Sequence, residues 1–137
     1  MTGDGSSVTF SKDDRGTVPC HPKISPTSLL LIGGLFMIKV KLSTDFPYEP
    51  IVRQTPGRRG IWGDCQFYIN SEIDDCDYWV VYNGVSHPET AYCPPQNTIL
   101  ITGEPPSILD YPAAYTRQFA RVVSCHSHIS HSRLILN

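Results

Sequence analysis

At 137 residues, the chain is long enough for one domain with its own core and too short for two full domains. Hydrophobic residues make up 40% of the chain and charged residues 18%, as in folded globular proteins. The formal net charge is −2 and no basic block occurs, which argues against nucleic acid and an anionic membrane surface as partners.

The first part of the chain differs in composition from the rest. Residues 1–28 are rich in Gly, Ser, Thr, Asp and Pro and show no apolar period, so no packed structure is expected there. The apolar run from Leu29 to Ile38 is too short to cross a bilayer, and no signal peptide is evident. We therefore expect a disordered or non-native extension over residues 1–36, a folded domain over 37–137 without a transmembrane segment, and a cytoplasmic or membrane-peripheral location.

The five cysteines show no paired spacing, and no CxxC motif occurs. Free thiols in a reducing compartment are the favoured interpretation. A disulfide among Cys65, Cys76 and Cys93 is the alternative.

The first element expected after the extension is a strand over 38–42, where apolar and polar residues alternate strictly. The following loop, 43–50, contains two aromatic residues and two carboxylates, which suit a hydroxyl-rich ligand. Tyr48 is therefore a candidate sugar contact, although the loop's aromatics could equally pack onto the core. Trp62, in the aromatic segment 60–70, could form a platform for a sugar, but a core anchor is the favoured interpretation.

A second buried strand is expected within residues 74–84, which are polar at first, then apolar, and end in Asn-Gly. The Asp75-Cys76-Asp77 step resembles the DxD metal motif of nucleotide-sugar enzymes. These acids precede the strand, however, so they are expected to be solvated at its amino end and to bind no metal. Residues 85–96 are expected to form a long loop.

The stretch from Asn97 to Ser107 is the centre of the functional hypothesis. Its β-branched run ends in Gly103, Glu104 and two prolines, which indicates a strand buried on both faces of a parallel sheet. Ligands bind beyond the carboxyl ends of such strands. Because Pro105 and Pro106 stiffen the chain, Glu104 is a candidate general base on a rigid support. The alternative is a glutamate that merely solvates a turn.

A short helix over 113–120 and a strand over 121–125 complete a strand–helix–strand unit. The tail after it carries Cys125 and three histidines, which could bind Zn²⁺. A solvated loop is favoured over a metal site, because no second cluster completes the ligand shell. His126 could instead line the same edge as Glu104.

Residues 101–107, Tyr111 to Phe119 and the strand at 121–125 together resemble the acceptor-side half of the fucosyltransferases of glycosyltransferase family 10, over roughly residues 37–137. In that family a Gly-Glu or Phe-Glu step ends a strand, and Glu104 matches the glutamate taken as the catalytic base. Pro105-Pro106 stand where animal members have Ser-Pro. The resemblance begins at Met37, which is therefore expected to be the natural start of the protein.

The resemblance implies an α/β fold, with a Rossmann-like parallel sheet and flanking helices, that forms the N-terminal half of a GT-B enzyme. The reaction implied is inverting transfer of L-fucose from GDP-fucose to a carbohydrate acceptor, with Glu104 as base and Trp62, Tyr48 and His126 near the acceptor. The donor nucleotide belongs to a second, C-terminal domain, so no cofactor is expected on this half and the chain alone is expected to be inactive. The alternatives are a non-catalytic α/β module that binds a glycan or a protein, and a metal or thiol protein built on Cys125 and the three histidines.

Overall fold

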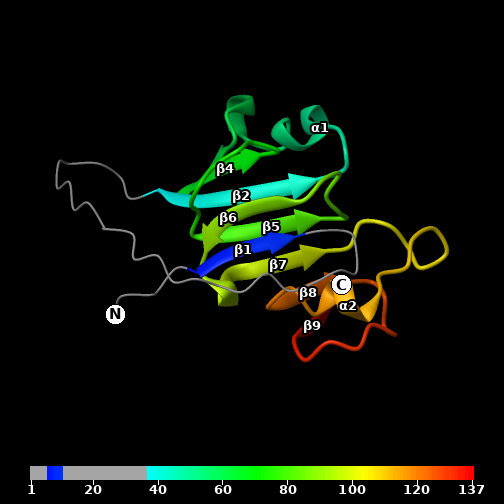
Figure 1. Cartoon of the computed structure of the whole chain (residues 1–137). Helices are drawn as coiled ribbons and strands as arrows, with labels where there is room; N and C mark the ends of the chain where they lie inside the picture. Colours follow the sequence, from blue (N-terminus) through cyan, green and yellow to red (C-terminus); the bar gives the residue numbers. More distant parts are fainter. Residues whose placement is uncertain (1–5, 11–36) are drawn as a thin grey trace.

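The computed structural model describes residues 6–10 and 37–137, which form a seven-stranded sheet and a two-stranded sheet. The large sheet has the strand order β3-β4-β2-β5-β7-β8-β9 (Figure 1). Its strands are β2 (Ile38–Thr44), β3 (Ile61–Trp62), β4 (Cys65–Ile69), β5 (Tyr78–Tyr82), β7 (Thr98–Ile101), β8 (Arg121–Ser124) and β9 (Leu134–Leu136). All neighbours are parallel except β3, which runs antiparallel to β4 at one edge. The parallel sheet expected of an α/β fold is thus confirmed.

The small sheet pairs β1 (Ser6–Phe10) with β6 (Glu89–Cys93) in antiparallel orientation. Ala91 and Cys93 of β6 are buried in one cluster with Trp79 and Leu100, so this sheet packs on one face of the large sheet. The prediction of a loop over 85–96 was therefore wrong. Its partner strand lies far away in the sequence, and five residues between prolines give too short an alternation to indicate a strand.

Helices are sparse in the described part of the chain. The two α-helices there, α1 (Tyr48–Val52) and α2 (Ala113–Thr116), are supplemented by the 3₁₀ turns η1 (Pro56–Arg58) and η2 (Pro95–Asn97). The expected helix over 113–120 ends early, yet the Tyr115 and Phe119 rings still meet edge to face with centroids 5.3 Å apart. Short proline-containing connections thus take the place of the longer flanking helices that were expected.

The core lies on one face of the large sheet. Trp79, Val81, Leu100 and Val122 alternate onto that face and are fully buried. On the opposite face, Val80, Ile99 and Ile101 are only half-buried, whereas Val40 of β2 and Ile69 of β4 are buried. The expectation that the 97–103 strand is buried on both faces was therefore wrong, because the described part of the chain has few helices to cover the second face.

A buried polar chain links the two sheets. Glu89 of β6 accepts a hydrogen bond from the Ser43 hydroxyl at 2.8 Å and pairs with the Lys41 ammonium at 2.9 Å. The Trp79 indole N–H donates to the Ser43 oxygen at 3.0 Å, and Lys41 Nζ lies 5.2 Å from the centroid of the Trp79 ring. Lys41 is only 3% exposed, so its charge depends on Glu89 for compensation.

The four cysteines among the described residues, Cys65, Cys76, Cys93 and Cys125, are free thiols. Contact with the Cys93 thiol lowers the pKa of Cys76, and the same contact raises the pKa of Cys93. The expectation of no packed structure over 1–28 was wrong for Ser6–Phe10, which pair with β6, and the rest of the expected 1–36 extension, including Cys20, lies outside the described residues. None of the helices that the structure describes is both long and apolar enough to cross a membrane.

Candidate functional site

Glu104 lies just past the carboxyl end of β7, the strand between β5 and β8. Both neighbours run parallel to β7, so the carboxyl ends of β5, β7 and β8 form one edge of the sheet, and Glu104 lies at this edge. Ligands of α/β proteins bind beyond such strand ends. Its side chain is half-buried, and among the described residues the carboxylate has no hydrogen-bond or ion-pair partner. Its backbone is held: the carbonyl oxygen of Glu104 accepts a hydrogen bond from His126 Nε2 at 2.7 Å.

An aromatic pair that the sequence did not single out lies beside this glutamate. The rings of Phe46 and Tyr82 have centroids 5.4 Å apart, and both side chains are half-buried. Tyr82 packs so closely on Gly103 that a Cβ at that position would lie 3.0 Å from the phenol oxygen. A larger residue before Glu104 would therefore require the Tyr82 ring to shift by a few tenths of an ångström. Phe46 follows the end of β2 by two residues and Tyr82 ends the neighbouring parallel strand β5, and this shared position after two strands is the signal that could have revealed the pair.

A polar chain connects the loops that follow β2, β5 and β7. The Tyr111 hydroxyl donates to Asn83 Oδ1, and Asn83 Nδ2 donates to the Asp45 carboxylate at 3.0 Å. Asn83 has φ of 68°, in the left-handed region that asparagine tolerates better than most residues. Burial raises the pKa of Tyr111 to about 12, so this phenol keeps its proton at neutral pH.

His126 is fully buried next to Glu104 and is positioned from two sides. Its backbone N–H donates to Ser124 Oγ at 2.9 Å, and the Thr102 hydroxyl donates to that same oxygen at 2.8 Å. The structure thus brings His126 to Glu104, which was the alternative expectation, and the favoured expectation of a solvated loop was wrong for this residue. A fully buried ring is poorly placed to touch a sugar, however, and its visible role is to hold the Glu104 backbone.

The structure does not bring Trp62 to this edge. Trp62 is 60% exposed, so the favoured prediction of a core anchor was wrong. It pairs with Cys65 at the amino end of β4, and β4, β2 and β5 separate its strand from β7. Tyr48 is the first residue of α1, which follows the carboxyl end of β2, but its side chain lies outside the described part of the structure.

The two acids of the DxD-like step lie at the amino end of β5, as predicted. Asp75 pairs with the Lys39 ammonium at 2.9 Å, and Asp77 accepts the Lys39 backbone N–H at 2.7 Å. Both carboxylates therefore bind the first residues of β2 on the side of the sheet opposite Glu104.

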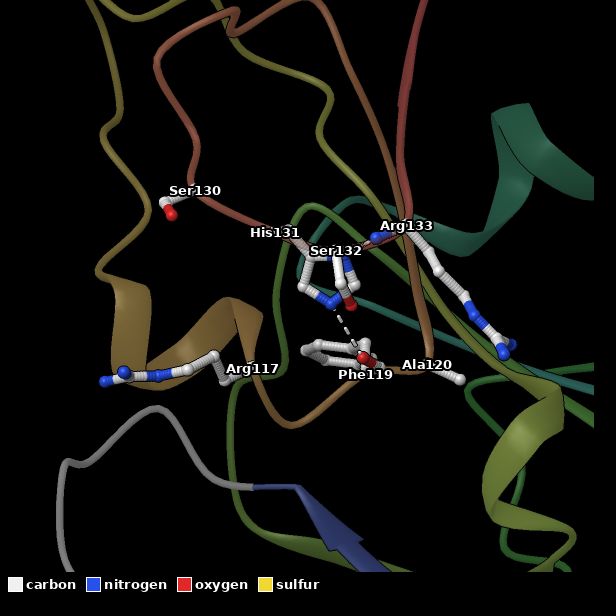
Figure 2. Close-up of a pocket in the computed structure, with 7 residues that line it drawn as sticks. All are labelled: Arg117, Phe119, Ala120, Ser130, His131, Ser132 and Arg133. Atoms are coloured by element: carbon white, nitrogen blue, oxygen red, sulfur yellow. Dashed lines mark hydrogen bonds between the residues drawn. The ribbon is translucent and has the colours of Figure 1, made fainter.

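Two hollows open elsewhere on the described surface. One of about 460 Å³ is lined by Arg117, Phe119, Ala120, Ser130, His131, Ser132 and Arg133 (Figure 2). The guanidinium groups of Arg117 and Arg133 point to opposite sides in Figure 2, so they do not converge on a common anion. The other hollow, of about 400 Å³, lies beside Lys41 and Glu89. Glu104 lines neither of them.

The edge around Glu104 thus combines a carboxylate with no partner in the part of the chain that the structure describes, an aromatic pair and a protonated phenol. A carboxylate held on a stiff turn can accept a proton from a hydroxyl group, and aromatic faces can pack on sugar rings. Comparisons of the chain with protein-family models, curated proteins and solved structures found no match.

Proposed function

We propose that the chain is the acceptor-side half of an inverting fucosyltransferase of the GT-B type, with Glu104 as the general base. The resemblance to glycosyltransferase family 10 suggests this reaction. The observation that carries the proposal is the half-buried carboxylate of Glu104, which has no partner among the described residues and lies directly beyond a strand with parallel neighbours on both sides.

In the proposed reaction, the acceptor hydroxyl oxygen attacks the anomeric carbon of the fucosyl donor. A new C–O bond forms, the bond to the diphosphate breaks with its electron pair on GDP, and Glu104 takes the hydroxyl proton. Pro105 and the His126 contact keep the Glu104 backbone in place, and Phe46 with Tyr82 offer an apolar surface for the acceptor ring. The donor nucleotide is assigned to a second domain, which would also stabilise the charge on the leaving diphosphate.

Glu104→Gln is expected to weaken the binding of an acceptor oligosaccharide about tenfold or more. A hydrogen bond from a sugar hydroxyl to a charged carboxylate is worth about 1.5–3 kcal/mol, and 1.4 kcal/mol corresponds to a factor of ten in Kd. Saturation-transfer NMR titrations with galactose- and N-acetylglucosamine-terminated oligosaccharides measure the affinity. Asp75→Asn, which removes a carboxylate at the opposite end of the strands, is the matched control and should leave Kd unchanged.

Three outcomes contradict the proposal. Equal acceptor binding by wild type and Glu104→Gln, or no binding of any acceptor, argues against a base at this position. Efficient fucose transfer from GDP-fucose by the 137-residue chain alone contradicts the assignment of a half-enzyme. Binding that survives Glu104→Gln while transfer is absent favours the non-catalytic glycan-binding module.

A further inference from the structure

A cluster of metal-binding side chains lies next to Glu104. Asp110, His126 and His128 each offer one ligand atom, and these atoms all lie within 4.8 Å of one another. Asp110 belongs to the segment between β7 and α2, and the two histidines follow β8. The crossover connection therefore brings Asp110 to two histidines that lie 16 and 18 positions later in the sequence.

The protonation of His126 leaves one nitrogen free for a metal. Its Nε2 lies 2.7 Å from the Glu104 carbonyl oxygen, which can only accept, so Nε2 carries the hydrogen. In the neutral ring the lone pair is then on Nδ1. That atom is buried and has no hydrogen-bond partner among the described residues. A buried polar atom without a partner is costly, and a bound cation would satisfy it.

The surroundings of the cluster match the outer shell of protein metal sites. Metal-bound histidines usually donate their second ring N–H to a carbonyl or carboxylate oxygen, as His126 does to Glu104. Asp110 Oδ1 accepts from the Tyr111 backbone N–H at 2.9 Å and lies 3.0 Å from His128 Nε2. The Tyr111 ring also packs edge-on against His126, with centroids 5.3 Å apart. One ligand is thus fixed by burial and a second by a backbone contact.

Stability alone does not explain the His128–Asp110 pair. The side chains are 54% and 73% exposed, and ion pairs with that exposure contribute little to folding. The same exposure allows both side chains to move toward a cation. Tetrahedral Zn²⁺ with Zn–N of about 2.0–2.1 Å requires ligand atoms roughly 3.3 Å apart, so the cluster has to contract by about 1.5 Å at most.

We propose that Asp110, His126 and His128 form a binding site for Zn²⁺ or a similar divalent transition metal. Two imidazoles and one carboxylate suit zinc, and three protein ligands leave a fourth position open for water or another small ligand. The proposal differs from the sequence expectation of a solvated tail, which did not include Asp110. It does not rest on the proposed transferase function.

Zinc titration of the full 137-residue chain tests the proposal. Competition with a chromophoric chelator should reveal one Zn²⁺ per chain, with an affinity at least tenfold lower in His128→Ala and in Asp110→Asn. Both side chains are exposed, so these variants should fold; circular dichroism of the metal-free proteins checks this. Added Zn²⁺ should raise the Tm of wild type and not of either variant.

Two controls separate this cluster from other ligands. His87→Ala removes an exposed histidine outside the cluster, and Cys125→Ser removes the neighbouring exposed thiol; both should retain wild-type affinity. The absence of stoichiometric binding overturns the proposal. Affinity that survives both His128→Ala and Asp110→Asn, or that is lost in Cys125→Ser instead, also overturns it.

Discussion

Replacing Glu89 by leucine is expected to lower the free energy of unfolding by about 3–5 kcal/mol, because it leaves the Lys41 ammonium buried without a counter-charge. Lys41 is 3% exposed, and its Nζ lies 2.9 Å from Glu89 Oε2. The contacts that would remain to the ammonium among the described residues are both uncharged: the Ser71 carbonyl oxygen at 3.0 Å and the Trp79 ring, whose centroid is 5.2 Å away. The Ser43 hydroxyl would also lose its acceptor. Urea unfolding followed by far-UV circular dichroism measures the change.

The double variant Lys41→Met/Glu89→Leu is the matched control for this prediction. Removing both charges replaces the ion pair by apolar side chains of similar size, which is often neutral or stabilising. We therefore expect the double variant to be more stable than Glu89→Leu alone. If the double variant is no more stable than Glu89→Leu, the two charges are not coupled as the structure shows. A loss below about 1 kcal/mol in Glu89→Leu would mean that water reaches Lys41.

Four strands of the parallel sheet, β2, β5, β7 and β8, could be predicted because their signal is local, whereas β4 and β9 were not predicted. The alternation after Met37 and the β-branched runs of β5, β7 and β8 are visible within a few residues each. Since those strands are parallel, the position of Glu104 at the carboxyl edge also followed from the sequence alone. The absence of long helices on the second face did not follow, because a run such as Thr98–Ile101 does not reveal whether one or both faces are fully covered.

The parts that could not be predicted depend on contacts between distant residues. Strand β6 is recognisable only through its pairing with β1, and the buried position of Lys41 only through Glu89. Trp62 was misjudged because a large aromatic residue is usually a core anchor, whereas the antiparallel edge strand β3 exposes it. Asp110 joins His126 only through the crossover, and no spacing within the tail indicates it.

Trp79→Ala is expected to lower the free energy of unfolding by about 3–5 kcal/mol, a large part of the roughly 5–15 kcal/mol that stabilises a typical domain. The Trp79 side chain is fully excluded from solvent, with 0% exposure, and it belongs to the core cluster that also contains Ala91 and Cys93 of the small sheet. The change removes the largest buried side chain of that cluster, the hydrogen bond to Ser43 and the ring beneath the Lys41 ammonium. Thermal and urea unfolding by circular dichroism should show a large loss of stability or no cooperative transition.

Trp79→Phe separates packing from the polar contact, because it keeps an aromatic ring and removes only the indole N–H and part of the volume. The loss of one neutral hydrogen bond and a small cavity predicts a cost of about 1–2 kcal/mol. If Trp79→Phe is as damaging as Trp79→Ala, the hydrogen bond to Ser43 matters more than the packing. If Trp79→Ala costs less than about 1 kcal/mol, the face that carries Trp79 is not the main core. In that case the small sheet would not be held on the large sheet by burial of apolar surface, and the Glu89–Lys41 pair would be its principal attachment.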